Sequence, residues 1–492
     1  PTSCSPQAQA TITKGVALLH SFQYMQSEQT FADAAKQDPQ CAMAQWGKAT
    51  ALYEQLWYFP APGTIAEARG YLEQVQKLGA PTAREREYIA AAAVLYQDDP
   101  KLSHRERAQT YSAALEKLYR DFPNDVDAGA FYALSLLTLA KPGDADLPDR
   151  EKAIAILNPL LKEHPEHPGV AHYLIHAADT PELAPQGLEA ARRYARIAPD
   201  SSHALHMPAH IFNRLGLWQE SIDSNLSAAA AAAKAGEMHM SESHYETHAL
   251  DFLDYAYLQT GQESKARHLV EEVKNVPGIS EEDLADFQSI FAARNALELH
   301  RWKEAAGLPV PTIRLTWQDT TYWARAIGAA RIGDVEGARK ATEKLREIVA
   351  SREESEKRKG NEVPAGKPVD LREAEAWLAF AEGKSDEALK IMRGAAERQE
   401  TERIEGLAIP AREMMADMLV ELRRPADALV EYKAALKESP NRFDALYGAA
   451  RAANFAGNAA ESREFFAKLV EISNPTADRP ELREARVSIA RK

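Results

Sequence analysis

The sequence has little cysteine and no long apolar run. Only Cys4 and Cys41 occur in 492 residues, and no Cys-x-x-Cys motif is present. The longest alanine run is Ala228–Ala233, and Lys234 follows it directly. A membrane-spanning helix needs about 18 or more consecutive apolar residues. We therefore expect a protein without a membrane span.

Negative charge outweighs positive charge, and several catalytic motifs are missing. The chain has 59 Lys and Arg against 73 Asp and Glu, a net charge of −14, which argues against a nucleic-acid binder. There is no glycine-rich phosphate loop and no G-x-S-x-G motif. The segment HYETH, His244–His248, is not the metalloprotease motif H-E-x-x-H, because Glu246 points about 200° from His244 around a helix.

The two cysteines predict a disulfide. A chain that otherwise avoids cysteine places one at its start, and a Cys4–Cys41 bond would pin this terminus to the second helix pair. Such a bond indicates an oxidising compartment, so we expect a periplasmic or secreted protein whose leader has been removed before Pro1. Two unrelated thiols are the alternative.

The composition and periodicity predict an all-α chain built from repeats. Apolar residues recur at i, i+3, i+4 and i+7 among Ala, Leu, Glu, Arg and Lys, and almost nothing is typical of a strand. Similar residues recur 34 positions apart: Tyr432 and Phe466, Ala435 and Leu469, Pro165 and Pro199. Phe31, Ala34 and Pro39 repeat the spacing of Tyr432, Ala435 and Pro440.

This pattern resembles the tetratricopeptide repeat. The resemblance implies a right-handed superhelical solenoid of antiparallel helix hairpins, with a concave surface lined by the first helix of each pair. We expect an array over residues 1–350 that carries a histidine-rich concave site at about 165–255, and further repeats over 371–492. Residues 141–149 read as a turn-rich insertion. Residues 351–370 read as a charged and then Pro/Gly-rich loop between the two parts.

Histidine is concentrated in one region. Eight of the 14 histidines lie between His172 and His248, and seven of these eight fall in three segments. Two segments share the pattern His-Tyr-x-x-His-Ala-x-Asp: His172, Tyr173, His176 and Asp179, then His244, Tyr245, His248 and Asp251. In the third segment, His206 and His210 follow His172 and His176 by 34 residues.

The spacing predicts a transition-metal site. Histidines at i and i+4 lie one above the other on a helix, a spacing suited to one metal ion. We expect imidazoles from His172, His176, His206, His210, His244 and His248 to share one ion or to line a two-ion site. Asp179 and Asp251 would be ligands, or acceptors that fix a histidine tautomer. His203 would add a ligand, and His20 and His239 are second-tier candidates.

The metal and its use stay open at this point. Imidazole with carboxylate suits zinc, iron or copper, and the neighbouring Met207, Met238 and Met240 favour copper slightly. The site would support hydrolysis, redox chemistry or metal carriage. The alternatives are a structural ladder of hydrogen-bonded histidines, and an organic or peptide ligand contacted by them. A non-catalytic scaffold that binds a protein or peptide in the groove is a further alternative, and an open solenoid can also self-associate.

Three segments together carry a narrower resemblance. DPQCAMAQWGKA, HYLIHAADTPE with SSHALHMPAHIFNRLG, and HALDFLDYAYLQTG resemble strings found in a group of bacterial tetratricopeptide-repeat proteins, often exported. The resemblance implies the fold, a bacterial origin and a specialised histidine region. No activity is established for that group, so it implies no reaction.

Overall fold

The protein is all-helical over the part that the structure describes. The computed structural model describes the chain except residues 57–59, 100, 141–146, 238–242, 312–317, 359–362, 364, 404–406 and 491–492. The described residues form helices and turns and contain no β-strand, which confirms the predicted fold class. No helix of this described part is both long and apolar enough to cross a membrane.

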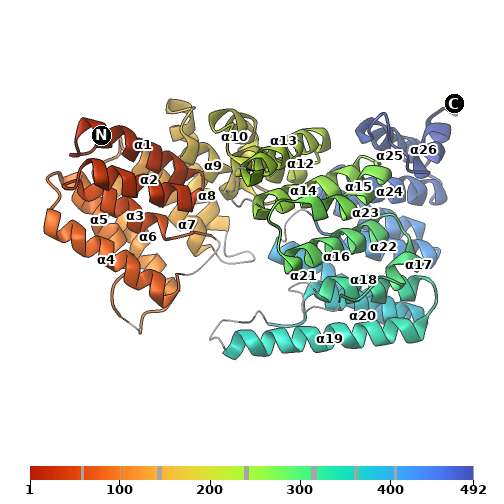
Figure 1. Cartoon of the computed structure of the whole chain (residues 1–492). Helices are drawn as coiled ribbons and strands as arrows, with labels where there is room; N and C mark the ends of the chain where they lie inside the picture. Colours follow the sequence, from red (N-terminus) through yellow and green to blue (C-terminus); the bar gives the residue numbers. More distant parts are fainter. Residues whose placement is uncertain are drawn as a thin grey trace. The chain divides into compact units, whose positions relative to one another are not determined.

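The chain divides into two compact units, which are described separately below (Figure 1). Unit 1 is Pro1–Ile211 and unit 2 is Phe212–Lys492, so the division falls inside α12 (Pro208–Leu215). Unit 1 also contains α1 (Pro6–His20), α2 (Tyr24–Gln37), α3 (Ala42–Ala51), α4 (Pro62–Leu78), α5 (Ala83–Leu95), α6 (His104–Asp121), α7 (Val126–Leu139), α8 (Leu147–Glu163), α9 (Pro168–Ala178), α10 (Ala184–Ile197) and α11 (Ser202–His206).

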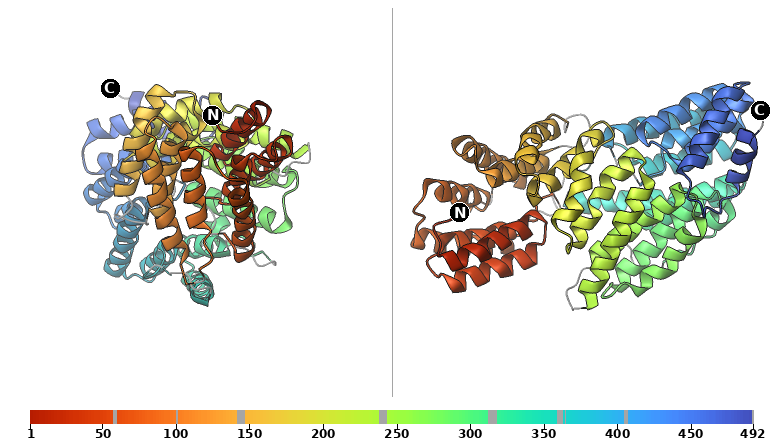
Figure 2. Two further views of the ribbon diagram at one scale, coloured as in Figure 1. Left: turned by 90° about the vertical axis from the view of Figure 1, so that its left-hand side faces the viewer. Right: turned by 90° about the horizontal axis from the view of Figure 1, so that it is seen from above.

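Unit 2 continues the same helical pattern, and Figure 2 shows its helices from two further sides. Its helices are α13 (Trp218–Glu237), α14 (Ser243–Gln259), α15 (Glu263–Glu272), the short 3₁₀ helix η2 (Val273–Asn275), α16 (Glu281–Glu298), α17 (Trp302–Ala306), α18 (Gln318–Arg331), α19 (Val335–Arg358), α20 (Val369–Ala381), α21 (Ser385–Glu402), α22 (Ala411–Glu421), α23 (Pro425–Glu438), α24 (Phe443–Phe455), α25 (Ala459–Ile472) and α26 (Glu481–Ala490).

In two hairpins, an aromatic ring packs directly onto a glycine of the next helix. A Cβ atom on Gly47 would lie 2.2 Å from the Phe31 ring, and one on Gly448 would lie 2.3 Å from the Tyr432 ring. The glycine follows the aromatic residue by 16 positions in both units. The second helix of a hairpin thus packs its ring directly onto the backbone of the next helix. This close packing explains why the pattern of Phe31, Ala34 and Pro39 recurs near the C-terminus.

The charged segment beginning at Ser351 is helical, which corrects one prediction. Helix α19 continues to Arg358, so residues 351–358 do not form the expected loop. Arg, Glu and Lys are good helix formers, and Lys357 lies 3.9 Å from Glu353 in an i,i+4 ion pair. Part of the predicted loop, 359–362 and 364, lies outside the described residues. So does most of the predicted insertion at 141–149, of which residues 147–149 begin α8.

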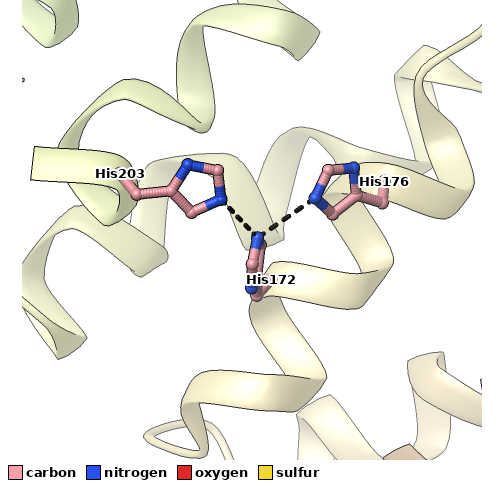
Figure 3. Close-up of side chains that lie close together, drawn as sticks. All are labelled: His172, His176 and His203. Carbon is pink, nitrogen blue, oxygen red and sulfur yellow. Dashed lines mark hydrogen bonds between the residues drawn. The ribbon is translucent and has the colours of Figure 1, made fainter. Parts of the chain in front are cut away.

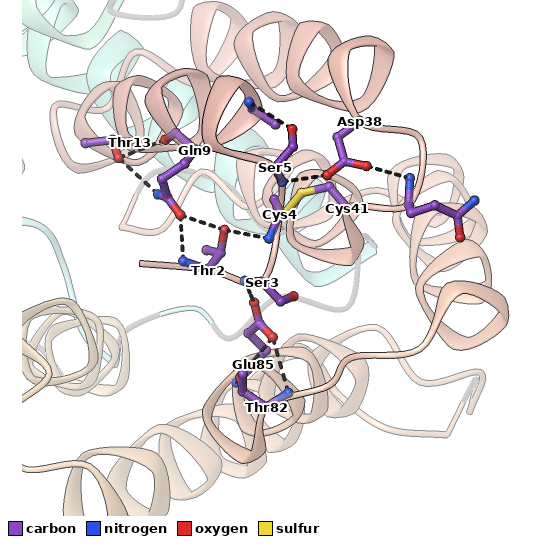
Figure 4. Close-up of a disulfide and its surroundings, with 12 residues drawn as sticks. Thr2, Ser3, Cys4, Ser5, Gln9, Thr13, Asp38, Cys41, Thr82 and Glu85 are labelled. Atoms are coloured by element: carbon purple, nitrogen blue, oxygen red, sulfur yellow. Dashed lines mark hydrogen bonds between the residues drawn. A yellow bond between two sulfur atoms is a disulfide. The ribbon is translucent and has the colours of Figure 1, made fainter.

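The predicted disulfide is present (Figure 4). The Cα atoms of Cys4 and Cys41 are 4.9 Å apart, and Cys41 is the N-cap of α3. Nearby, the Ser5 backbone N–H donates to Asp38 at 2.7 Å and the Ser3 N–H donates to Glu85 at 2.6 Å. The N-terminal residues are therefore fixed to the start of the second hairpin and to α5.

A buried arginine just before α24 contacts α14, α16 and α22 of unit 2. Arg442, which is fully buried, pairs with Glu298 on α16 at 2.8 Å and with Glu413 on α22 at 2.7 Å. Its guanidinium also donates to the Tyr255 hydroxyl on α14 at 3.0 Å. Next to it, the Phe443 N–H donates to Gln259 at 2.9 Å. Unit 2 therefore has a polar core that joins helices far apart in the sequence.

Loss of the disulfide is expected to destabilise the protein. For a crosslink spanning 37 residues, the chain-entropy relation gives about 4 kcal/mol of unfolding free energy for the double variant Cys4→Ser/Cys41→Ser. Urea denaturation of the oxidised protein measures this loss. Dithiothreitol should lower the stability of the wild type to that of the variant and leave the variant unchanged. An equal effect of the reductant on both proteins would contradict the expectation.

Candidate metal centre

Two helices of unit 1 bring three histidines together. Helix α9 begins at Pro168, and the His167 ring caps it by accepting the Val170 N–H at Nδ1 (3.2 Å). His172 and His176 lie one turn apart on α9 and both face inward. His203 lies in the first turn of α11, which the Ser201 hydroxyl caps by accepting the Ala204 N–H at 3.3 Å.

The three Nε2 atoms meet at one point (Figure 3). The Nε2 atom of His172 is 3.1 Å from that of His176 and 3.1 Å from that of His203. These three Nε2 atoms form one of the groups in the described part of the chain whose donor atoms lie within 4.8 Å of one another. Nitrogens bound tetrahedrally to zinc at 2.0–2.1 Å would lie about 3.3–3.4 Å apart. The two separations from His172 are close to those of a loaded site.

The tautomer of His172 determines whether its Nε2 can offer a lone pair to a metal ion. Its Nδ1 is 2.7 Å from the His20 carbonyl oxygen, which only accepts hydrogen bonds, so Nδ1 carries the proton. Burial lowers the pKa of His172 to about 3, and the hydrogen bond to His20 opposes this shift only in part. The ring is therefore neutral at pH 7, and its Nε2 presents a lone pair to the other two histidines.

A hydrogen-bonded ladder fits this geometry poorly. One in-plane lone pair on His172 faces two Nε2 atoms at the same distance, and it has room for one good donor. A cation at the meeting point would use the same lone pair together with those of His176 and His203. Burial, reinforced by the neighbouring imidazoles, also lowers the pKa of His176 and His203 well below 6.5, so both rings are neutral and able to bind a metal.

The carbonyl that orients His172 is itself held in place. The His20 ring is fully buried; its Nε2 donates to Asp127 at 2.9 Å, and its Nδ1 accepts from the Tyr173 hydroxyl at 2.9 Å. A Cβ atom at position 169 would lie 2.3 Å from His20 Nδ1, so Gly169 is needed there. Metal-binding histidines commonly rely on such outer hydrogen bonds for their orientation.

A second group, His20, Asp127 and His167, is a hydrogen-bond network and not a metal site. His167 accepts the Val170 N–H at Nδ1, so its Nε2 carries a proton and donates to Asp127 at 3.0 Å. Burial would raise the pKa of Asp127, but the hydrogen bonds from His167 and His20 hold it well below its usual range. Both nitrogens that face the carboxylate are donors, which leaves no lone pair for an ion.

His206 and His210 form a neighbouring pair. Their Nε2 atoms are 3.1 Å apart, and His210 donates its Nδ1 proton to Asp179 at 3.0 Å. The Asp179 carboxylate therefore accepts a hydrogen bond from His210. The ring centres of His176 and His210 are 6.4 Å apart, so the pair lies beside the three-histidine group.

The remaining predicted residues belong to unit 2. His244 and His248 lie on α14 with stacked rings 6.2 Å apart, and His248 meets Phe252 edge-on at 5.2 Å. Asp251 forms an ion pair with Arg294 at 2.7 Å. The two copies of His-Tyr-x-x-His-Ala-x-Asp therefore give their aspartates different partners. His239, Met238 and Met240 lie outside the described residues, and Met207 is buried where α11 meets α12.

Sequence reasoning ranked His203 too low and missed Phe22. His203 follows His172 by 31 residues and not 34, so the repeat register does not select it; its place one turn before His206 was the available signal. Phe22, with φ of +57°, places its ring centre 4.4 Å from that of His172 and 5.7 Å from that of His203. This ring forms an apolar wall of the site, and no motif marks it.

Comparison with known proteins identifies the repeat. A family model described as Tetratricopeptide repeat matches residues 419–484, in α22–α26 of unit 2. The matched hairpins are tetratricopeptide repeats, as the sequence predicted for this part of the chain. No curated protein sequence matches the chain.

Solved structures give only distant likenesses. The human IFIT1 dimer with m7Gppp-AAAA is 15% identical, with 88% of this chain and 90% of that chain covered and a TM-score of 0.40. The P58(IPK) TPR domain is 11% identical, with 98% of each chain covered and a TM-score of 0.23. Scores this low do not establish a common arrangement of repeats, so nothing about ligands follows for this chain.

The His172 tautomer is directly testable. In metal-free protein at pH 7, we expect His172 to carry its proton on Nδ1, because the His20 carbonyl accepts it. Long-range ¹H–¹⁵N correlation spectra of ¹⁵N-histidine-labelled protein report the tautomer, and the spectrum of His172→Gln assigns the signal. Asp127→Asn should broaden or shift this signal, since it loosens His20, whereas the exposed-site variant His164→Ala should not. A proton on Nε2 would contradict the proposed geometry.

Proposed function

We propose that this protein is a metal-binding helical-repeat protein that holds one transition-metal ion at His172, His176 and His203. The observation that supports it is the meeting of three Nε2 atoms around a lone pair that the His20 carbonyl directs inward. All three rings are neutral at pH 7, as metal binding requires. The surrounding Phe22 and Tyr173 rings keep the site apolar.

The donor set favours zinc or copper. Three imidazoles without a carboxylate suit these ions better than magnesium, calcium or manganese, which prefer oxygen ligands. Three protein ligands leave a further coordination position for water or a substrate, the pattern of catalytic rather than structural zinc sites. We therefore favour metal-dependent chemistry over a purely structural ion. His206 and His210, next to His176, would supply further donors or hydrogen-bonding groups at that position.

We also propose that the protein works outside the cytoplasm, in the periplasm or as a secreted protein. The Cys4–Cys41 disulfide supports this, because disulfides persist mainly in oxidising compartments. The resemblance of its histidine-rich segments to exported bacterial proteins points the same way. A second candidate function is protein or peptide binding by the repeats, which is the general use of tetratricopeptide arrays.

The metal proposal is tested by elemental analysis and by titration. Protein purified without a histidine tag or chelating resin should contain about one zinc or copper ion per chain. After treatment with a chelator and dialysis, it should bind Zn²⁺ or Cu²⁺ again in calorimetric titration. His172→Gln and His203→Gln should each lose the ion, because each removes one of three ligands. The matched control His164→Ala, an exposed histidine of the same unit, should retain it.

Two results would overturn the proposal. One is metal-free protein that takes up neither Zn²⁺ nor Cu²⁺ at micromolar concentration. The other is full metal content in His203→Gln, which would place the ion elsewhere. Circular dichroism of each variant separates loss of the ion from loss of the fold. Capture of a peptide by metal-free wild type would support the second candidate function instead.

A further inference from the structure

Unit 2 contains a pocket unrelated to the histidines of unit 1. It has a volume of about 660 Å³ and lies between α13, α14 and α15. Pockets of roughly 300–1,000 Å³ are the usual size for small-molecule ligands. Helix α13 contributes leucine and alanine to its wall, while α14 and α15 contribute both apolar and charged residues. The pocket therefore has an apolar wall on α13 and a mixed apolar and charged wall on α14 and α15.

The floor of the pocket is apolar. Leu250 and Leu253 of α14 and Leu269 of α15 line it and belong to the buried core of this part of unit 2. Leu226 of α13 lies at the pocket with 47% of its surface exposed to water. The floor leucines are already buried, so Leu226 offers the apolar surface that a ligand can cover, at about 25 cal/mol per Å².

One carboxylate in this pocket has no compensating cation. Glu246 is half-buried and makes no hydrogen bond or ion pair with the residues that the structure describes. Burial raises its pKa to about 7, and the negative charge of Glu272 adds to the rise. No positive group of the described residues lowers the pKa of Glu246. A ligand that brings a positive charge would remove this penalty.

The two basic residues of the pocket contact other lining residues and not Glu246. The Lys265 ammonium lies 5.1 Å from the centre of the Tyr257 ring, in a cation–π contact. His268 lies 4.0 Å from Glu272. No basic residue of α13 lines the pocket. Neither of these basic residues forms an ion pair with Glu246 in the described part of the chain.

We infer that this pocket binds a small amphipathic amine. Its apolar body would cover Leu226 at the wall of the pocket, above the buried leucine floor, and its ammonium group would pair with Glu246. The charge of Glu272 would strengthen the preference for a cation. The site lies wholly within unit 2, so the inference stands or falls independently of the metal centre.

Binding of matched probes by calorimetry tests the inference. 2-Phenylethylamine and hexylamine should bind, 2-phenylethanol should bind at least about tenfold more weakly, and 3-phenylpropanoate should not bind. The difference arises because only the amines make a charge-assisted contact with Glu246. Glu246→Gln should weaken amine binding about tenfold and leave 2-phenylethanol unchanged. Ala229→Trp, which fills the pocket from α13, should abolish binding of both amines.

An exposed glutamate of the same unit, Glu282, serves as the control. The variant Glu282→Gln should leave amine binding unchanged. Equal affinity for the amine and the alcohol would overturn the charge pairing. Unchanged amine binding in Glu246→Gln or in Ala229→Trp would place the amine elsewhere. Failure of both amines to bind at millimolar concentration would overturn the inference as a whole.

Discussion

The histidine centre depends on one hydrogen bond, from Nδ1 of His172 to the backbone carbonyl of His20. A neutral imidazole has one N–H and one lone pair, so fixing the proton on one nitrogen directs the lone pair of the other. Here the lone pair points at His176 and His203. Without that carbonyl, the same rings would form an ordinary hydrogen-bonded ladder. The chemistry of α9 is therefore set by the last residue of α1, 152 positions earlier.

This dependence explains several features of unit 1 that a simple repeat array does not need. Repeats in a solenoid contact mainly their neighbours, yet the His20 ring of α1 lies against α7 and α9. The ring is buried with both nitrogens bonded, and a buried polar network of this kind stabilises one arrangement only when every member is satisfied. The Cys4–Cys41 bond anchors the other end of α1 to α3. Both ends of α1 are thus fixed, which keeps the carbonyl in position.

The sequence predicted what depends on period and composition and missed what depends on neighbours in space. The 34-residue register correctly predicted the helical hairpins, and the scarcity of cysteine correctly predicted the disulfide. The 34-residue register also singled out His172 and His176. His203 received a low rank because it stands three positions off that register. The loop expected at 351–358 is helical because alternating Glu, Arg and Lys stabilise α19, although the same charges also suit a solvated loop.

The two copies of His-Tyr-x-x-His-Ala-x-Asp show why a repeated motif does not carry a repeated role. Asp179 accepts a hydrogen bond from His210, whereas Asp251 meets the guanidinium of Arg294, which α16 supplies. A carboxylate beside an imidazole sets a tautomer; the same carboxylate beside an arginine forms an ion pair and has no effect on a histidine. The deciding residue lies on an adjacent helix, beyond the reach of the motif itself. Duplication preserves side chains and spacing, but the neighbouring helix determines what they do.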